Sequence, residues 1–125
     1  MNATCGILIN GDRILIVKLS EQTDWLLPCG EITNGVDDSI KKLMLDKLNI
    51  SVRPLHAIRP HEKNNLITHP MVLEYIEGAP EFKGYTHLKF VNKSESKKVR
   101  IDILHRSIVA TFFDSYSIFL RKDRN

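Results

Sequence analysis

The fold is decided by the stretch Trp25-Leu26-Leu27-Pro28-Cys29-Gly30-Glu31-Ile32-Thr33-Asn34-Gly35, which leads into an amphipathic segment that ends at Leu48-Asn49-Ile50. Residues 25–28 form a short apolar strand ended by proline, and Cys29-Gly30 and Asn34-Gly35 are two glycine turns. Apolar residues then recur at the spacing of one helix face; they are Ile40, Leu43, Met44 and Leu48. We therefore expect a helix over residues 38–48, with Asp37 and Asp38 capping its start.

Upstream of this stretch the sequence predicts a β-hairpin. Residues 3–9 and 13–18 are short runs rich in Ile, Leu and Val. The dipeptide Asn10-Gly11 between them tolerates the positive φ angles of a type I′ turn.

Downstream, the pattern predicts three more strands. The strand over residues 50–58 contains Pro54, which removes a backbone N–H, so it should lie at an edge or a bulge. Residues 59–65 are a polar loop, and residues 66–77 are the next strand. Residues 85–91 alternate between two faces, which is typical of a strand.

The C-terminal part of the chain predicts a second helix. Over residues 102–120, apolar and small side chains recur at helical spacing; they are Leu104, Ile108, Thr111, Phe112, Ser115 and Phe119. The order of elements favours an α+β fold, a sandwich in which a mixed sheet has one helix on each side. We expect one domain over residues 1–125.

Composition limits the classes of function. The chain has 125 residues, 42% of them hydrophobic and 26% charged, and a formal net charge of +3. No stretch approaches the roughly 20 apolar residues of a membrane span, and the basic residues of 93–100 and of the tail (Arg121, Lys122 and Arg124) are typical of a solvated surface. We therefore expect no membrane association and no nucleic acid partner. The N-terminal residues do not have the basic start, apolar stretch and cleavage site of a secretory signal, so we expect a cytoplasmic protein.

The quoted stretch resembles the entry to the Nudix (MutT-like) box, GX5EX7REUXEEXGU, in which U is aliphatic. The order of elements resembles the Nudix fold along nearly all of the chain, and the motif resemblance covers about 25 residues. In that family a helix presents glutamates to divalent cations. The resemblance therefore implies an α/β/α sandwich and a site for a phosphorylated ligand next to this helix.

Most of the carboxylates of the box are missing from this sequence. Gly30 takes the first glycine, but Val36 stands at the first acidic position, and an ungapped register leaves nothing acidic further on. A register shortened by two residues fits better. It places Lys42 at the arginine, Leu43 at its glutamate, Met44 at the aliphatic position, Asp46 and Lys47 at the paired glutamates, Asn49 at the glycine and Ile50 at the last aliphatic position.

The resemblance implies two sets of site residues. If the protein is active and holds Mg²⁺ or Mn²⁺, the best choices for catalysis are Asp46, Asp38 and Glu31, and for the metal Asp46 and Asp37. If it is inactive, it needs no cofactor, and cationic side chains hold the phosphates instead. The ligand-binding residues are then Lys18, Gly30, Lys42, Lys47, Tyr85 and His87.

Two functions follow from these sets. The first is a Nudix-type protein with a degenerate box that binds a nucleotide or a phosphorylated metabolite with little or no hydrolysis. The second is a divergent hydrolase that cleaves a nucleoside diphosphate-linked substrate with Mg²⁺. Lys47 favours the first, because an ammonium at a ligand position repels the cation. An altered chemistry that uses His87 or His61 is a third alternative, and the family often forms homodimers.

Overall fold

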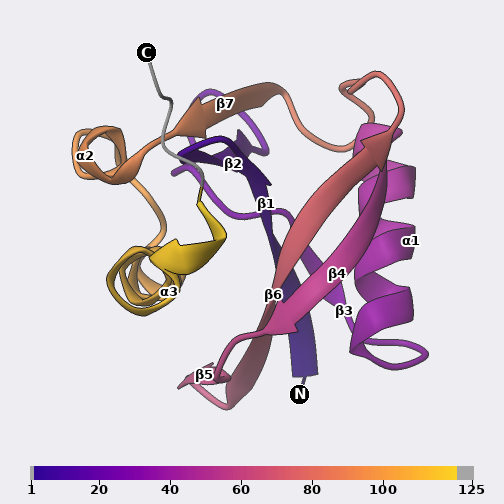
Figure 1. Cartoon of the computed structure of the whole chain (residues 1–125), viewed down its shortest axis with the longest axis horizontal. Coiled ribbons are helices and arrows are strands. Elements are labelled where there is room, and N and C mark those ends of the chain that lie inside the picture. The colour runs from indigo at the N-terminus through magenta and orange to yellow at the C-terminus, as the bar shows by residue number, and fades with distance from the viewer. Residues whose placement is uncertain (1, 121–125) are drawn as a thin grey trace.

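A mixed sheet lies between two helical layers in the computed structural model, which describes residues 2–120. In chain order the elements are β1 (Asn2–Asn10), β2 (Arg13–Lys18), β3 (Cys29–Glu31), α1 (Val36–Leu48), β4 (Ser51–Ala57), β5 (His61–Lys63), β6 (Leu66–Glu77), β7 (His87–Val91), α2 (Lys93–Ser96), α3 (Ile103–Ser115) and η1 (Ser117–Phe119). The sheet order is β4-β6-β1-β2-β7, with β3 paired to β1 and β5 to β6. Figure 1 shows α1 on one side of the sheet and α2 and α3 on the other.

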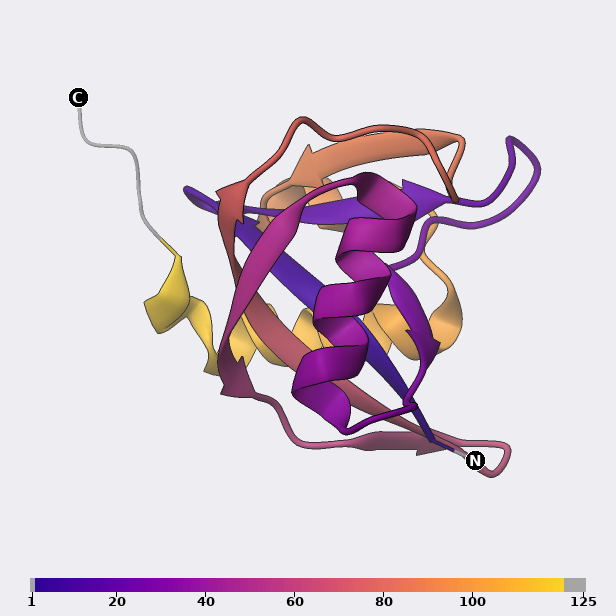
Figure 2. The ribbon, with the colours of Figure 1, turned by 90° about the vertical axis from the view of Figure 1, so that its right-hand side faces the viewer.

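Strand β1 separates two hydrophobic clusters. Cys5 and Ile7 face the cluster that contains Phe112 of α3, whereas Leu8 faces the cluster that contains Met44 of α1. Because successive residues of a strand point to opposite faces, one apolar strand supplies both cores. Figure 2 shows α1 lying across one face of the sheet. The expected α+β sandwich with a mixed sheet is thus confirmed.

Helix α1 has the expected apolar face but a different start. Ile40, Met44 and Leu48 are fully buried, as the spacing predicts. The helix begins at Val36, and its N-cap is Gly35, which makes no side-chain cap hydrogen bond. The expectation that Asp37 and Asp38 cap the helix is therefore wrong. They lie in its first turn, where carboxylates interact favourably with the helix dipole.

The hairpin turn lies one residue later than expected, and the first short strand begins four residues later. Asn10 pairs with Arg13, so the loop is Gly11 with Asp12. Only Gly11 of these two has a positive φ, which excludes the expected type I′ turn. The strand expected before Pro28 is reduced to isolated bridges at Trp25 and Leu26, and β3 begins after the proline.

The downstream strands match the pattern with one addition. β6 has the predicted bounds, and β4 is an edge strand whose register shifts after Pro54. The predicted polar loop contains the short strand β5, because Asn64 and Asn65 both have positive φ and form a tight turn into β6. Within residues 2–120 no helix is long and apolar enough to cross a membrane. The basic tail residues Arg121, Lys122 and Arg124 lie outside this range.

Helix α3 buries a histidine that orders the segment before β3. Asp102 caps the helix, because its side chain accepts a hydrogen bond from the Leu104 N–H at 3.2 Å. One turn later the Nδ1 atom of the buried His105 accepts a hydrogen bond from the Leu27 N–H at 2.9 Å. The imidazole must be neutral at Nδ1 to accept this bond. The predicted helix ends at Ser115 and is followed by η1.

The first prediction concerns Gly78, at the end of β6. Its φ is +108°, and a Cβ there would collide with the Asn49 carbonyl oxygen, so Gly78→Ala should lower the free energy of unfolding by more than about 2 kcal/mol. The matched control is Gly35→Ala, at a glycine with φ of 86° and ψ of 162° but no atom within 4 Å of the added Cβ; backbone strain alone should cost about 1–3 kcal/mol there, less than the loss in Gly78→Ala. Urea unfolding curves measure both, and equal losses would contradict the collision.

The second prediction concerns His105. Burial lowers its pKa, and the nearby Asp102 opposes this more weakly. The folded pKa lies below the unfolded value of about 6.5, so this stabilisation is present above that pH and is lost as the pH falls through the folded pKa. His105→Asn keeps an acceptor for Leu27 without titrating. Its unfolding free energy should fall less than that of the parent between about pH 7.5 and pH 5; parallel losses would refute the assignment.

Candidate functional site

The segment 83–86 connects the end of α1 to the end of β2. The Lys47 carbonyl oxygen accepts hydrogen bonds from the Gly84 N–H at 3.2 Å and the Lys83 N–H at 3.3 Å. The Thr86 N–H donates to the Lys18 carbonyl oxygen at 2.8 Å. Two of the expected phosphate-binding lysines, Lys47 and Lys18, are therefore attached to the same short segment.

Tyr85, between these contacts, holds the start of β3. Its hydroxyl oxygen accepts a hydrogen bond from the Cys29 N–H at 3.3 Å, and its ring is 5% exposed. Burial, with a smaller effect of the neighbouring Cys29 thiol, raises the pKa of Tyr85 to about 12. Burial also raises the pKa of Cys29. Tyr85 is thus a neutral residue that positions the loop, and its ring is not exposed for stacking on a base.

Leu43 and Lys47 lie where the shortened register expects glutamates. A Cβ added to Gly30 would lie 3.1 Å from the Leu43 Cδ1 atom, so Leu43 covers Gly30. The stem of Lys47 packs against Gly84, and its ammonium lowers the pKa of Cys29 against the larger effect of burial. The positive charge of Lys47 therefore acts at the start of β3, next to Gly30.

The end of α1 is compatible with this register, which stays a prediction. Asn49 adopts the left-handed conformation, with φ of 59°, that a glycine position favours. Ile50 and Met44, at the two aliphatic positions, are almost completely buried.

The carboxylates expected at the site are dispersed. Asp46 forms an ion pair with Lys42, and both side chains are exposed on α1. Glu31, Asp37 and Asp38 are exposed. Among residues 2–120, no three His, Cys, Asp or Glu side chains are close enough together to hold a metal ion. Mg²⁺ and Mn²⁺ need several converging oxygen ligands, so the residues present do not fit either cation.

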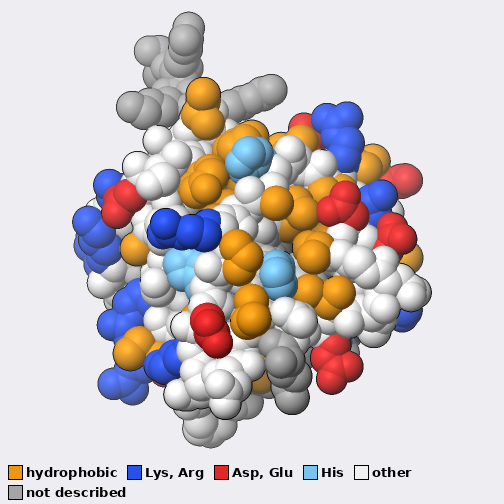
Figure 3. Space-filling model, turned by 90° about the horizontal axis from the view of Figure 1, so that it is seen from below, with side chains coloured by type: hydrophobic (Ala, Val, Ile, Leu, Met, Phe, Trp, Pro, Cys, Tyr) orange, Lys and Arg blue, Asp and Glu red, His pale blue; other side chains and the backbone are white. Residues whose placement is uncertain are grey.

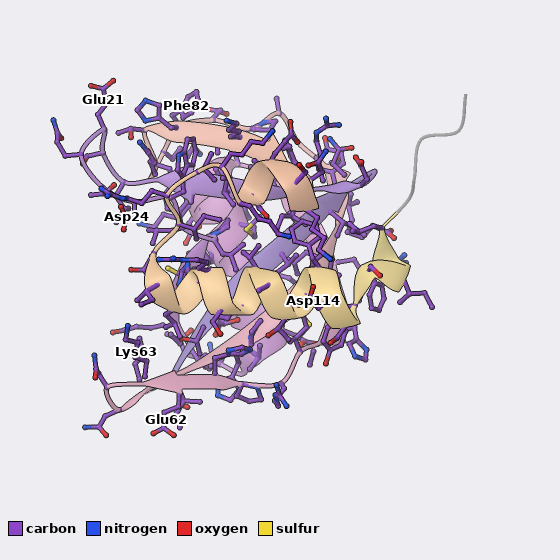
Figure 4. All side chains as sticks on the ribbon, turned by 90° about the vertical axis from the view of Figure 1, so that its left-hand side faces the viewer. Glu21, Asp24, Glu62, Lys63, Phe82 and Asp114 are labelled. Atoms are coloured by element: carbon purple, nitrogen blue, oxygen red, sulfur yellow. The ribbon has the colours of Figure 1, made fainter. Side chains whose placement is uncertain are left out.

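Lys18 and His87 face the loop of residues 19–25. The Lys18 Nζ atom lies 5.1 Å from the centroid of the Trp25 ring, within the range of a cation–π contact, and donates to the Glu21 carbonyl oxygen at 3.4 Å. His87 contacts Trp25 edge to face at 6.3 Å and lies 3.9 Å from a Glu21 carboxylate oxygen. Figure 4 shows Glu21 and Asp24 on this loop, at the same end of the molecule as Phe82.

The sequence pattern did not identify three residues that shape this region. The Cys29 N–H donates a hydrogen bond to Tyr85, and the Trp25 ring contacts Lys18. The third residue, His105, accepts a hydrogen bond from the Leu27 N–H. A signal for His105 exists, because it lies three and four residues before the buried Ile108 and Val109. No comparable signal marks Cys29, whose partner is 56 positions away.

Comparisons with known proteins give matches at the level of structure. No family model matches the sequence, and no curated protein matches it. Among solved structures, MutT described from Aliivibrio salmonicida and Vibrio cholerae is 18% identical over 90% of this chain and 96% of that chain, with a TM-score of 0.79. A Nudix hydrolase from Nitrosomonas europaea is 10% identical over 98% and 75%, with a TM-score of 0.77. An ADP-ribose pyrophosphatase from Streptococcus suis is 13% identical over 98% of both chains, with a TM-score of 0.70.

These likenesses extend over almost the whole chain at identities too low to indicate a shared activity. The chain has the fold of the Nudix hydrolases.

Proposed function

We propose that this protein binds a nucleotide or another phosphorylated small molecule beside α1 and hydrolyses it little or not at all. The observation that carries the proposal is Lys47. Its ammonium acts at the start of β3, and its stem is held against Gly84. A lysine in that position attracts phosphate by charge and disfavours a divalent cation.

Leu43 supports the absence of a metal-dependent reaction. It packs over Gly30 at a position where the Nudix pattern has a glutamate. An aliphatic side chain contributes no ligand, and Asp46 is engaged by Lys42. Residues 2–120 hold no group of three carboxylates, histidines or cysteines that could keep a cation on the phosphates, and in this proposal the lysines neutralise their charge instead.

An exposed aromatic residue near Lys47 suits a nucleotide. Phe82 is 63% exposed and precedes Lys83, whose N–H donates to the Lys47 carbonyl oxygen. A base stacked on such a ring would leave its phosphates within reach of a lysine. Two structures with this fold are named an ADP-ribose pyrophosphatase and a UDP-X diphosphatase, and both names denote nucleoside diphosphate compounds. These names support a nucleotide as the first ligand to test.

The third prediction is that nucleotide binding does not depend on metal. Titration calorimetry with ATP and with ADP-ribose should give the same Kd in EDTA and in Mg²⁺, within about twofold. Lys47→Met keeps the stem that packs on Gly84 and removes the charge, so it should weaken binding about tenfold, which corresponds to about 1.4 kcal/mol. Lys41→Met is the matched control, because Lys41 is an exposed residue of the same helix.

The competing outcome has a distinct signature. If binding needs Mg²⁺ or Mn²⁺, if product appears, and if Asp46→Ala abolishes that product, then the divergent hydrolase is correct. In that case the carboxylates Glu31, Asp37, Asp38 and Asp46 would have to converge around the ion. Phe82→Ala gives a separate check, since it should weaken ATP binding and leave binding of inorganic tripolyphosphate unchanged.

A further inference from the structure

A basic cavity lies on the side of the molecule away from α1. It has a volume of about 740 Å³ and lies between α2, the segment 97–101 and α3. Five cationic side chains and one carboxylate line it; they are Lys93, Lys97, Lys98, Arg100, Arg106 and Asp114. Figure 4 looks onto this side, with α2 above α3 and Asp114 on α3, and Figure 3 shows Lys and Arg gathered along the corresponding left edge.

Most of this positive charge is not neutralised within the protein. Asp114 pairs with Lys93 at 3.3 Å, and Arg100 lies 3.9 Å from Asp24. For the described part of the chain, no ion pair is found at the other three cations, Lys97, Lys98 and Arg106. Like charges gathered in one cavity repel one another, and a multivalent anion would relieve this repulsion.

The backbone that carries these cations is fixed by hydrogen bonds. Asn92 and Glu95 form a reciprocal capping box at the start of α2, and Glu95 also pairs with Arg13 at 3.2 Å. The Lys98 N–H donates to the Glu95 carbonyl oxygen at 3.0 Å, and the Arg100 carbonyl oxygen accepts from the Trp25 N–H at 2.8 Å. The cavity therefore needs little ordering of its backbone when a ligand binds, which favours affinity.

The floor of the cavity distinguishes among anionic ligands. It is formed by apolar side chains that include Ile101, Val109 and Phe113. Phe113 is the aromatic residue of the lining and is only 5% exposed, so it offers no platform on which a base of a nucleic acid strand could stack. The volume is that of a small-molecule site, about 300–1,000 Å³.

We propose that this cavity binds an oligophosphate anion of three or more phosphates, either free or as the tail of a nucleotide. The site is separate from the one beside α1, and it shares no residue with the binding proposal made for Lys47. Lys97, Lys98 and Arg106 supply the charge, and the guanidinium of Arg106 can bind two phosphate oxygens at once.

The test uses inorganic tripolyphosphate as the probe, with calorimetry for affinity and amide chemical-shift mapping for location. One variant, called the groove variant because it removes three charges from this cavity, combines Lys97→Gln, Lys98→Gln and Arg106→Gln. The control is Lys41→Gln with Lys63→Gln and Arg59→Gln, which removes the same number and kinds of charge from exposed positions elsewhere. The groove variant should bind at least about tenfold more weakly, and the control should stay within about twofold of the parent.

The mapping should show shifts at residues 93–106 in the parent and equally in Lys47→Met, in which the site beside α1 is weakened. The same mapping with ATP shows whether a nucleotide tail is accepted: shifts at residues 93–106 with ATP and none there with adenosine support it. The proposal is overturned if the control loses as much affinity as the groove variant. It is also overturned if residues 93–106 show no shifts, or if a single-stranded oligonucleotide binds more tightly than tripolyphosphate per phosphate.

Discussion

The pairing of β1 on both of its edges is the constraint on which the rest of the structure depends. β1 runs parallel to β6 along one edge and antiparallel to β2 and β3 along the other. At Gly6 the missing side chain matters, because a Cβ there would lie 2.6 Å from the Leu73 Cδ1 atom and 3.3 Å from the Ile40 Cδ1 atom. A side chain at this position would therefore displace Leu73 of β6 and press on Ile40 of α1, so glycine suits the close packing of α1 on β1 and β6.

The sequence predicted the elements whose signal is local. The helical spacing of apolar residues predicted α1, and the alternation of side chains between two faces predicted β7. Pro54 predicted that β4 lies at an edge of the sheet. The sequence did not predict the strands whose formation depends on pairing with distant residues. Residues 61–63 are polar and become a strand only because the Asn64-Asn65 turn folds them back onto β6. The apolar Trp25 and Leu26 were expected to form a strand, yet they are limited to single bridges with Ile101 and Val17.

For the candidate site as well, the sequence gives the residue types but not their tertiary partners. The residue types at the box positions can be read from the chain, so the loss of carboxylates and the presence of Lys47 were expected from the sequence. The partners of those residues could not be read, because they lie far away in sequence: Tyr85 with Cys29, and Gly84 with Lys47. Lys42 and Asp46 are four residues apart, so their ion pair on the helix surface could be expected from the sequence, whichever register of the box is chosen. The basic cavity is formed by α2 and α3 together, and only the fold brings Arg106 next to Lys97 and Lys98.

The irregularity of β4 has a consequence for how these molecules meet one another. An exposed edge strand is a template on which a second chain can extend the sheet, and soluble proteins must prevent this. β4 pairs with β6 through two register shifts, one after Ser51 and one after Pro54, and proline offers no N–H to a neighbour. Arg53, next to that proline, keeps a charge at this edge and pairs with Glu74 of β6 at 2.7 Å. An incoming strand would find neither a continuous ladder nor an apolar row, so this edge resists sheet-to-sheet aggregation even when the protein is concentrated.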